Sequence, residues 1–198
     1  MLVAKRIFDG LFSSIGLIFI SPIFILLSIL IALDSQGGIF YKQVRIGKNM
    51  RPFKLLKFRT MYANSDRKGL LTVGNKDNRI TRIGYYLRKY KLDELPQLIN
   101  VLIGDMSFVG PRPEVEKYVK LYNNEQQKVL SVKPGITDWA SIRYVNESEL
   151  LAQSCEPEKT YINEIMPAKL AINLEYVKQN NLLIDIKIIL HTFKAILR

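Results

Sequence analysis

The sequence has almost none of the residues that bind zinc or form cross-links. Cys155 is the only cysteine and His191 the only histidine among 198 residues. A single cysteine excludes an internal disulfide framework and suits a reducing cytoplasm. One cysteine and one histidine are also too few for a structural zinc site. We therefore interpret Cys155 as an ordinary thiol.

Acidic residues are nearly absent from one block. Residues 42–91 hold 15 lysines and arginines against only Asp66 and Asp77, a net charge of +13, while the whole chain carries +11. Such a block suits anionic lipid head groups, a phosphorylated substrate or nucleic acid. It contains no zinc-finger, RNP or homeodomain pattern, so no nucleic-acid partner is expected. A plain basic patch beside a membrane is the simplest alternative.

Charge is missing altogether from the apolar run Leu11–Leu33. As a straight helix this run would extend about 34 Å, enough to cross a hydrocarbon core of about 30 Å. Ser21 and Pro22 lie at its centre. Because Pro22 has no N–H for the carbonyl of Ile18, the helix should bend there. Basic residues flank both ends, which favours the cytoplasmic side for both.

These features predict a re-entrant membrane segment, a broken helix that enters the membrane and returns. Residues 1–35 would form the anchor and residues 36–198 a cytoplasmic domain. A straight membrane anchor is the main alternative. A signal peptide is not favoured, because its apolar region is about 7–15 residues long and no small-x-small cleavage site follows Leu33.

The remaining pattern predicts an α/β fold, mostly helical with a small β-sheet. The final segment, Leu182–Leu197, combines a wide apolar face with several charges. It is therefore expected in the core or as an amphipathic helix in the membrane interface, and not as a second span. The other expected elements are strands at Ile39–Val44 and Phe53–Met61, a polar loop at Asn64–Arg79, and helices at Leu92–Leu102 and Glu114–Leu130.

Two adjacent carboxylates, Asp93 and Glu94, stand at the start of a predicted helix. Carboxylates there usually serve as caps, because the free N–H groups and the helix dipole favour negative charge. Here cations surround them: Arg88 precedes the pair, and Arg112 follows with a proline on each side. The prolines restrict the backbone, which suits a guanidinium that is held ready to bind phosphate. Carboxylate, divalent metal and arginine are the parts that phosphoryl transfer needs, and an aspartate can itself attack phosphorus.

One nearly continuous stretch, from Leu92 to Pro113, carries a specific signature. Motifs at Lys57–Met61 and Lys133–Thr137 and the Ser21-Pro22 pair accompany it. On these residues the chain resembles the bacterial sugar transferases, monotopic phosphoglycosyl transferases that move a sugar phosphate from a nucleotide sugar to polyprenol phosphate. The matching stretches are Leu92-Asp93-Glu94-Leu95-Pro96-Gln97-Leu98, Asn100-Val101-Leu102, Gly104-Asp105-Met106-Ser107 and Val109-Gly110-Pro111-Arg112-Pro113.

The resemblance implies that Asp93 is the nucleophile and forms a phosphosugar-aspartyl intermediate. Glu94 would assist, in the lipid-phosphate step or in organising the metal, and Mg²⁺ would bind Asp93 and the substrate phosphates. The implied donor is a UDP-sugar and the acceptor undecaprenyl phosphate, which places the protein among phospholipids at the cytoplasmic face of the bacterial inner membrane, at the start of glycan, capsule or lipopolysaccharide assembly. The implied substrate-binding residues are Lys57, Arg59, Arg88, Pro111, Arg112 and Pro113.

The chain also departs from the family pattern. Asp138 and Ser141 stand where many members have Gly and Gln, and the segment Ser141–Tyr161 lacks an Asn-Gly-Arg-Asn stretch. Because of these departures, the sequence does not identify the sugar that is transferred. It does not identify the pathway or the oligomeric state either. Two other hypotheses remain at this point. One is a non-catalytic peripheral scaffold that binds anionic lipid through residues 42–91; the other is a fragment of a polytopic transferase with a periplasmic N-terminus.

Overall fold

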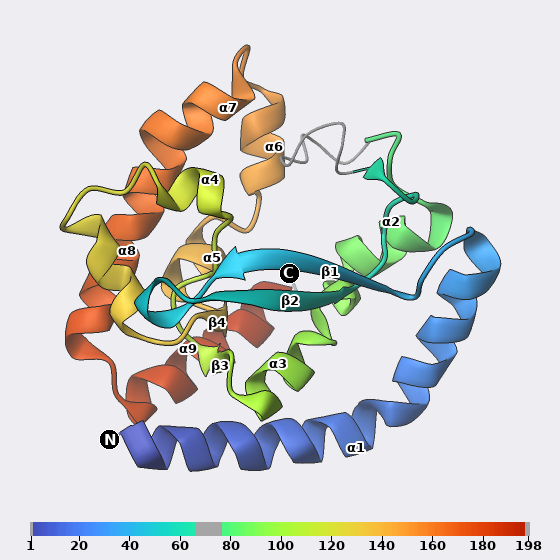
Figure 1. The fold of residues 1–198 in the computed structure, drawn as a ribbon, viewed down its shortest axis with the longest axis horizontal. Helices are drawn as coiled ribbons and strands as arrows, with labels where there is room; N and C mark the ends of the chain where they lie inside the picture. Colours follow the sequence, from blue (N-terminus) through green and yellow to red (C-terminus); the bar gives the residue numbers. More distant parts are fainter. Residues whose placement is uncertain (1, 66–76, 197–198) are drawn as a thin grey trace.

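The computed structural model describes residues 2–65 and 77–196, so most of the predicted loop at Asn64–Arg79 lies outside it. Within these ranges the fold is mostly helical, as predicted, and it has two small two-stranded sheets where one was expected (Figure 1). The described elements are α1 (Leu2–Asp34), β1 (Phe40–Ile46), η1 (Lys48–Met50), β2 (Pro52–Phe58), α2 (Arg82–Lys89), η3 (Leu92–Glu94), α3 (Gln97–Ile103), β3 (Ser107–Val109), α4 (Glu116–Val119), η4 (Gln126–Ser131), β4 (Gly135–Thr137), α5 (Trp139–Arg143), α6 (Glu147–Ala152), α7 (Pro157–Thr160), η5 (Tyr161–Ile165), α8 (Met166–Gln179) and α9 (Leu182–Ile196).

The apolar N-terminal segment forms one helix, α1, which is long and apolar enough to cross a membrane. Figure 1 shows α1 running beneath α3 and then turning up beside α2, so the predicted bend is present. The helix is bent and not interrupted, because it continues through Pro22. Ser21 Oγ donates to the Ile18 carbonyl at 2.8 Å. Ser21 thereby satisfies the acceptor that the missing N–H of Pro22 leaves free.

Both ends of α1 are bound by the rest of the protein. Near the N-terminus, Lys5 pairs with Asp185 of α9 at 2.7 Å. Arg6 donates to carbonyl oxygens at the C-terminal end of α3. At the other end, the Asp34 carboxylate accepts the backbone N–H of Ile83, in the first turn of α2, at 3.1 Å. The helix is therefore anchored on the folded domain at both of its ends.

The first predicted strand pair is confirmed. β1 and β2 form an antiparallel hairpin in which Phe40 lies opposite Phe58 and Ile46 opposite Pro52. Its turn includes Asn49 in the left-handed region, with φ of 55°. Asparagine tolerates this conformation better than most residues. The second sheet, a parallel pairing of β3 with β4, was not predicted, because each strand has only three residues.

Two predicted helices differ in the structure. The helix at Glu114–Leu130 is wrong: only α4 and the 3₁₀ segment η4 form there. Asn123 and Gln126 exchange side-chain to backbone hydrogen bonds at 2.9 Å, which compete with a continuous helix. The helix at Leu92–Leu102 is divided into η3 and α3, with Pro96 between them. The C-terminal helix is confirmed as α9, whereas α2 and α5–α8 were not predicted.

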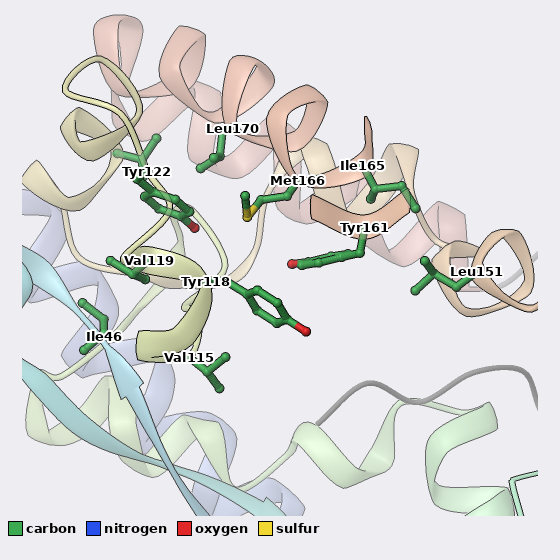
Figure 2. Packing of buried hydrophobic residues seen from close by; sticks show 11 residues of the cluster. Ile46, Val115, Tyr118, Val119, Tyr122, Leu151, Tyr161, Ile165, Met166 and Leu170 are labelled. Carbon is green, nitrogen blue, oxygen red and sulfur yellow. The ribbon is translucent and has the colours of Figure 1, made fainter. Parts of the chain in front are cut away.

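The core consists of several apolar clusters, and two of them flank the predicted site. One packs α1 and α2 against the end of β2 through Leu27, Ile31, Phe58 and Leu87. The larger one joins α4, η5 and α8 (Figure 2), where the rings of Tyr118 and Tyr161 lie 4.9 Å apart. Its members are Ile46, Val115, Tyr118, Val119, Tyr122, Val129, Leu151, Tyr161, Ile165, Met166 and Leu170.

Candidate active site

A cavity of about 1250 Å³ brings the predicted charged residues together. Its walls come from the β1–β2 hairpin, α2, η3 and the segments after β3 and β4, with apolar side chains of α1 and α9 on the same wall. Pro111 and Pro113 instead border a small void of about 20 Å³ behind Arg112. The predicted residues that line the large cavity are Lys57, Arg59, Arg88, Asp93, Glu94 and Arg112.

Local backbone geometry aims both carboxylates into the cavity. Lys91 adopts a left-handed conformation with φ of 56°, and the chain then makes the single 3₁₀ turn η3. Pro96 follows at the N-cap of α3, where the lack of an N–H is harmless. Asp93 and Glu94 therefore sit on a tight, buried turn between two helices and not within a regular α-helix.

Glu94 is fully engaged by two cations. Lys57 Nζ lies 2.9 Å from Oε1. Arg112 grips the carboxylate with both terminal nitrogens, from Nη1 to Oε2 at 3.2 Å and from Nη2 to Oε1. Burial alone would raise the pKa of Glu94, but the ion pairs with Arg112 and Lys57 outweigh it and hold that pKa well below the ordinary value. Glu94 is therefore ionised and immobilised.

Asp93 has the opposite environment. It is only 5% exposed, and its ion pair among the described residues is with Lys57, whose Nζ lies 3.7 Å from Oδ2. Among the described residues, Oδ1 has no hydrogen-bond partner. Burial raises the pKa of Asp93, and Lys57 offsets this only in part. A buried oxygen without a partner, facing a cavity, is a candidate for direct contact with a substrate or a metal.

Arg88 complements Asp93 from the last turn of α2. It lines the same cavity, and its charge acts to lower the pKa of Asp93. In the part of the chain that the structure describes, no hydrogen bond or ion pair of the Arg88 guanidinium is found. Its donors are thus available for an anion, whereas those of Arg112 are largely directed at Glu94.

The loop that carries Arg112 is held along its whole backbone. Gly110 N donates to Thr137 O at 3.1 Å, and Pro111 O accepts Gly135 N at 3.1 Å. A Cβ on Gly110 would come within 2.3 Å of the Lys133 carbonyl, so this close approach requires glycine. Arg112, two residues after Gly110, donates its N–H to Asp138 Oδ2 at 2.8 Å. These bonds add to the restriction that the two prolines were predicted to impose.

Lys57 is positioned by a residue that the sequence reasoning passed over. The Asn100 side chain accepts the N–H of Leu56 and donates to the carbonyl of Lys54, both at 2.9 Å. Asn100 thereby ties β2 to α3 and brings Lys57 over η3. The available signal was its place in the family stretch Asn100-Val101-Leu102. Asp138 was noted in the sequence only as a departure from the family, yet it fixes the Arg112 backbone.

Arg59 lines the cavity, as predicted, but most of its guanidinium is bound to the backbone. Its guanidinium binds carbonyl oxygens at the C-terminal end of α1, namely Ser35 O at 2.7 Å, Ile31 O at 3.4 Å and Gln36 O. Positive charge at a helix C-terminus is favourable. Arg59 borders the cavity, but these donors are already occupied. Its role in substrate binding stays a prediction.

The donor set also bears on metal binding. Within residues 2–65 and 77–196, no cluster of three or more His, Cys, Asp and Glu side chains could hold an ion. Among the described residues, Asp93 Oδ1 is the one buried carboxylate oxygen without a hydrogen-bond partner. One carboxylate suits Mg²⁺, which keeps several waters and takes its other ligands from substrate phosphates. The residues present therefore fit the predicted ion.

The site thus combines a buried carboxylate that has a free oxygen with paired and unpaired cations, beside a long apolar helix. This set of groups suits phosphate transfer. The family model described as bacterial sugar transferase matches residues 1–198. The chain belongs to this family, as its motifs predicted.

Curated relatives extend the comparison. The chain is 35% identical, over 98% of its length, to a UDP-N-acetylgalactosamine-undecaprenyl-phosphate N-acetylgalactosaminephosphotransferase of Aeromonas hydrophila. It is 35% identical, over 95% of its length, to a UDP-glucose:undecaprenyl-phosphate glucose-1-phosphate transferase of Escherichia coli. It spans only 43% and 39% of these two proteins. An exopolysaccharide production protein ExoY of Sinorhizobium fredii is 36% identical over 98% of the chain and 85% of its own length.

Proposed function

We propose that this protein transfers a sugar 1-phosphate from a UDP-sugar to undecaprenyl phosphate and releases UMP, as an early step of exopolysaccharide or other glycoconjugate assembly. The observation that carries the proposal is the free Oδ1 of buried Asp93, which faces a cavity lined by Arg88 and Lys57. The names of the Aeromonas and Escherichia relatives supply the donor and acceptor classes. A purely lipid-binding scaffold is not favoured, because it has no use for this carboxylate.

The proposed chemistry proceeds in two displacements. Asp93 Oδ1 attacks the phosphorus that bears the sugar, and the bond from that phosphorus to the bridging oxygen breaks as UMP leaves with the electron pair. An oxygen of undecaprenyl phosphate then attacks the same phosphorus and restores the free Asp93 carboxylate. Arg88 binds phosphate oxygens, while Glu94 holds Lys57 and Arg112 at the reacting group, so that charge stabilisation is organised beforehand. Bound Mg²⁺ would supply neutralisation of phosphate charge at Asp93.

The proposed location is the cytoplasmic face of the inner membrane, with α1 entering and leaving on the same side. Support comes from the attachment of both ends of α1 to one domain, at Lys5 and at Asp34. Apolar side chains between them are exposed, such as Phe19 at 79%. Single cysteines at Leu2 and Gly38, in a Cys155→Ser background, should both react only from the cytoplasm. Labelling of position 2 by an impermeant reagent in the periplasm would refute this topology.

The function is tested with purified protein, undecaprenyl phosphate and a panel of UDP-sugars, with UMP release as the readout. We expect UMP release with at least one donor. Release should stop when a chelator removes Mg²⁺ and recover when Mg²⁺ is restored. Full activity in excess chelator would remove the metal from the proposal. Absence of UMP release across the panel, with purified protein that remains folded, would count against the proposed reaction.

A further inference from the structure

Lys5 belongs to the membrane helix, yet its ammonium group is bound inside the folded domain. It donates to Asp185 Oδ2 at 2.7 Å, to the Tyr176 hydroxyl at 2.9 Å and to the Val109 carbonyl at 2.9 Å. Asp185 is 3% exposed and Tyr176 4%. The three donors of the ammonium group are thus all used by buried partners from α9, α8 and β3.

One of these partners is the residue that leads into the Arg112 loop. Val109 ends β3 and directly precedes Gly110, so its carbonyl is the first backbone acceptor of that loop. The neighbouring residues are bound by the same helix: Asp9 Oδ1 accepts Ser107 Oγ and Phe108 N, both at 3.1 Å. α1 therefore contacts three consecutive residues of β3 through buried polar groups. We call Lys5, Asp9, Tyr176 and Asp185 the α1 latch.

We propose that Lys5 is a positioning residue, which places Arg112 in the active site by holding the Val109 carbonyl. Packing of α1 against the folded domain and ordering of the Arg112 loop are then coupled. The inference rests on the proposed function for its effect on turnover. The contrasting explanation is that Lys5 acts only as a positive charge that fixes membrane orientation. That explanation gives no role to Asp185, a carboxylate 180 residues away in the sequence.

The first test compares Lys5→Met with Asp185→Asn in reconstituted full-length protein. We expect each variant to lose roughly 10- to 100-fold in kcat, because a small displacement of a phosphate-contacting group has effects of that size. Lys194→Met, which removes an exposed lysine from the same helix as Asp185, is the matched control and should keep the wild-type kcat. Wild-type kcat for Asp185→Asn would overturn the proposal and leave only the topological role of Lys5.

The double variant Lys5→Met/Asp185→Asn separates positioning from stability. With both charges of the Lys5–Asp185 pair gone, neither member leaves the other as an unpaired buried ion, so the thermal midpoint should return towards wild type. The kcat should stay low, because the Val109 carbonyl still lacks the Lys5 donor. If kcat recovers in parallel with the thermal midpoint, the latch is merely structural and the proposal fails.

Hydrogen exchange provides a readout that does not depend on the reaction. Gly110 and Arg112 carry the only backbone N–H groups from Gly110 to Pro113, and both are hydrogen-bonded. Their exchange should be faster in Lys5→Met, Asp185→Asn and the double variant than in wild type or Lys194→Met. Unchanged exchange in all three latch variants would overturn the inference even if the protein is an active transferase. If the latch variants exchange faster but the wild-type protein shows no transferase activity, the latch is retained and the proposed function is rejected.

Discussion

Asp93 and Glu94 are neighbours in the chain but occupy opposite electrostatic regions. On the Glu94 side, Arg112 and Lys57 saturate the carboxylate and keep its pKa low. On the Asp93 side, burial raises the pKa, and one oxygen has no partner among the described residues. Two adjacent acids therefore differ in their contacts: Glu94 binds two cations, whereas Asp93 keeps one oxygen without a partner.

The largest effect is expected for Asp93→Asn, because an amide cannot supply the attacking oxygen. Turnover should fall below detection. Intact-mass analysis after incubation with the donor alone should show a phosphosugar adduct on wild type and none on the variant. Asp105→Asn, which changes an acid just after the C-terminal end of α3 and outside the cavity lining, is the matched control and should carry the adduct. Wild-type protein that turns over without ever carrying an adduct, even in rapidly quenched samples, would favour direct attack by the lipid phosphate.

A smaller but substantial effect is expected for Arg112→Lys. A lysine keeps the charge but cannot grip both oxygens of Glu94, so the organised side of the site should loosen. We expect a loss of roughly 10²- to 10³-fold in kcat, nearly as large as for Arg112→Ala, since one preorganised donor contributes about this much. Steady-state UMP release measures it. A lysine variant close to the wild-type rate would show that Arg112 acts by charge alone.

The smallest effect separates the two acids by stability. The folded state raises the pKa of Asp93, so its ionisation opposes folding at neutral pH, and Asp93→Asn should raise the thermal midpoint by a few degrees. Glu94→Gln should lower it by several degrees, because Arg112 and Lys57 lose their shared partner. The stability from Glu94 is present above its ordinary pKa and is lost as pH falls towards its lowered folded pKa. Thermal scans at neutral and acidic pH test this, and shifts of the same sign for both variants would contradict the contrast.

Short-range patterns accounted for much of the fold. The β1–β2 hairpin, α9 and the bend of α1 were predicted, because strand alternation, helical apolar spacing and Pro22 act over a few residues. The helix expected at Glu114–Leu130 failed where the side chains of Asn123 and Gln126 bind the backbone. The short helices α5 to α7 were missed, since helices of this length are held mainly by tertiary packing. The 14-residue helix α8 was missed as well.

The chemistry of the site divides in the same way. The sequence was enough to identify the groups that are present: Asp93, Glu94, the cations around them and a long apolar helix. Only the tertiary structure decided which carboxylate is engaged, because the partners of Glu94 lie 37 residues before it and 18 after it. It also decided that Arg59 binds the end of α1 and that Lys5 reaches Val109. Charge and reactivity are properties of single residues, whereas pKa and hydrogen-bond satisfaction depend on groups that only folding brings together.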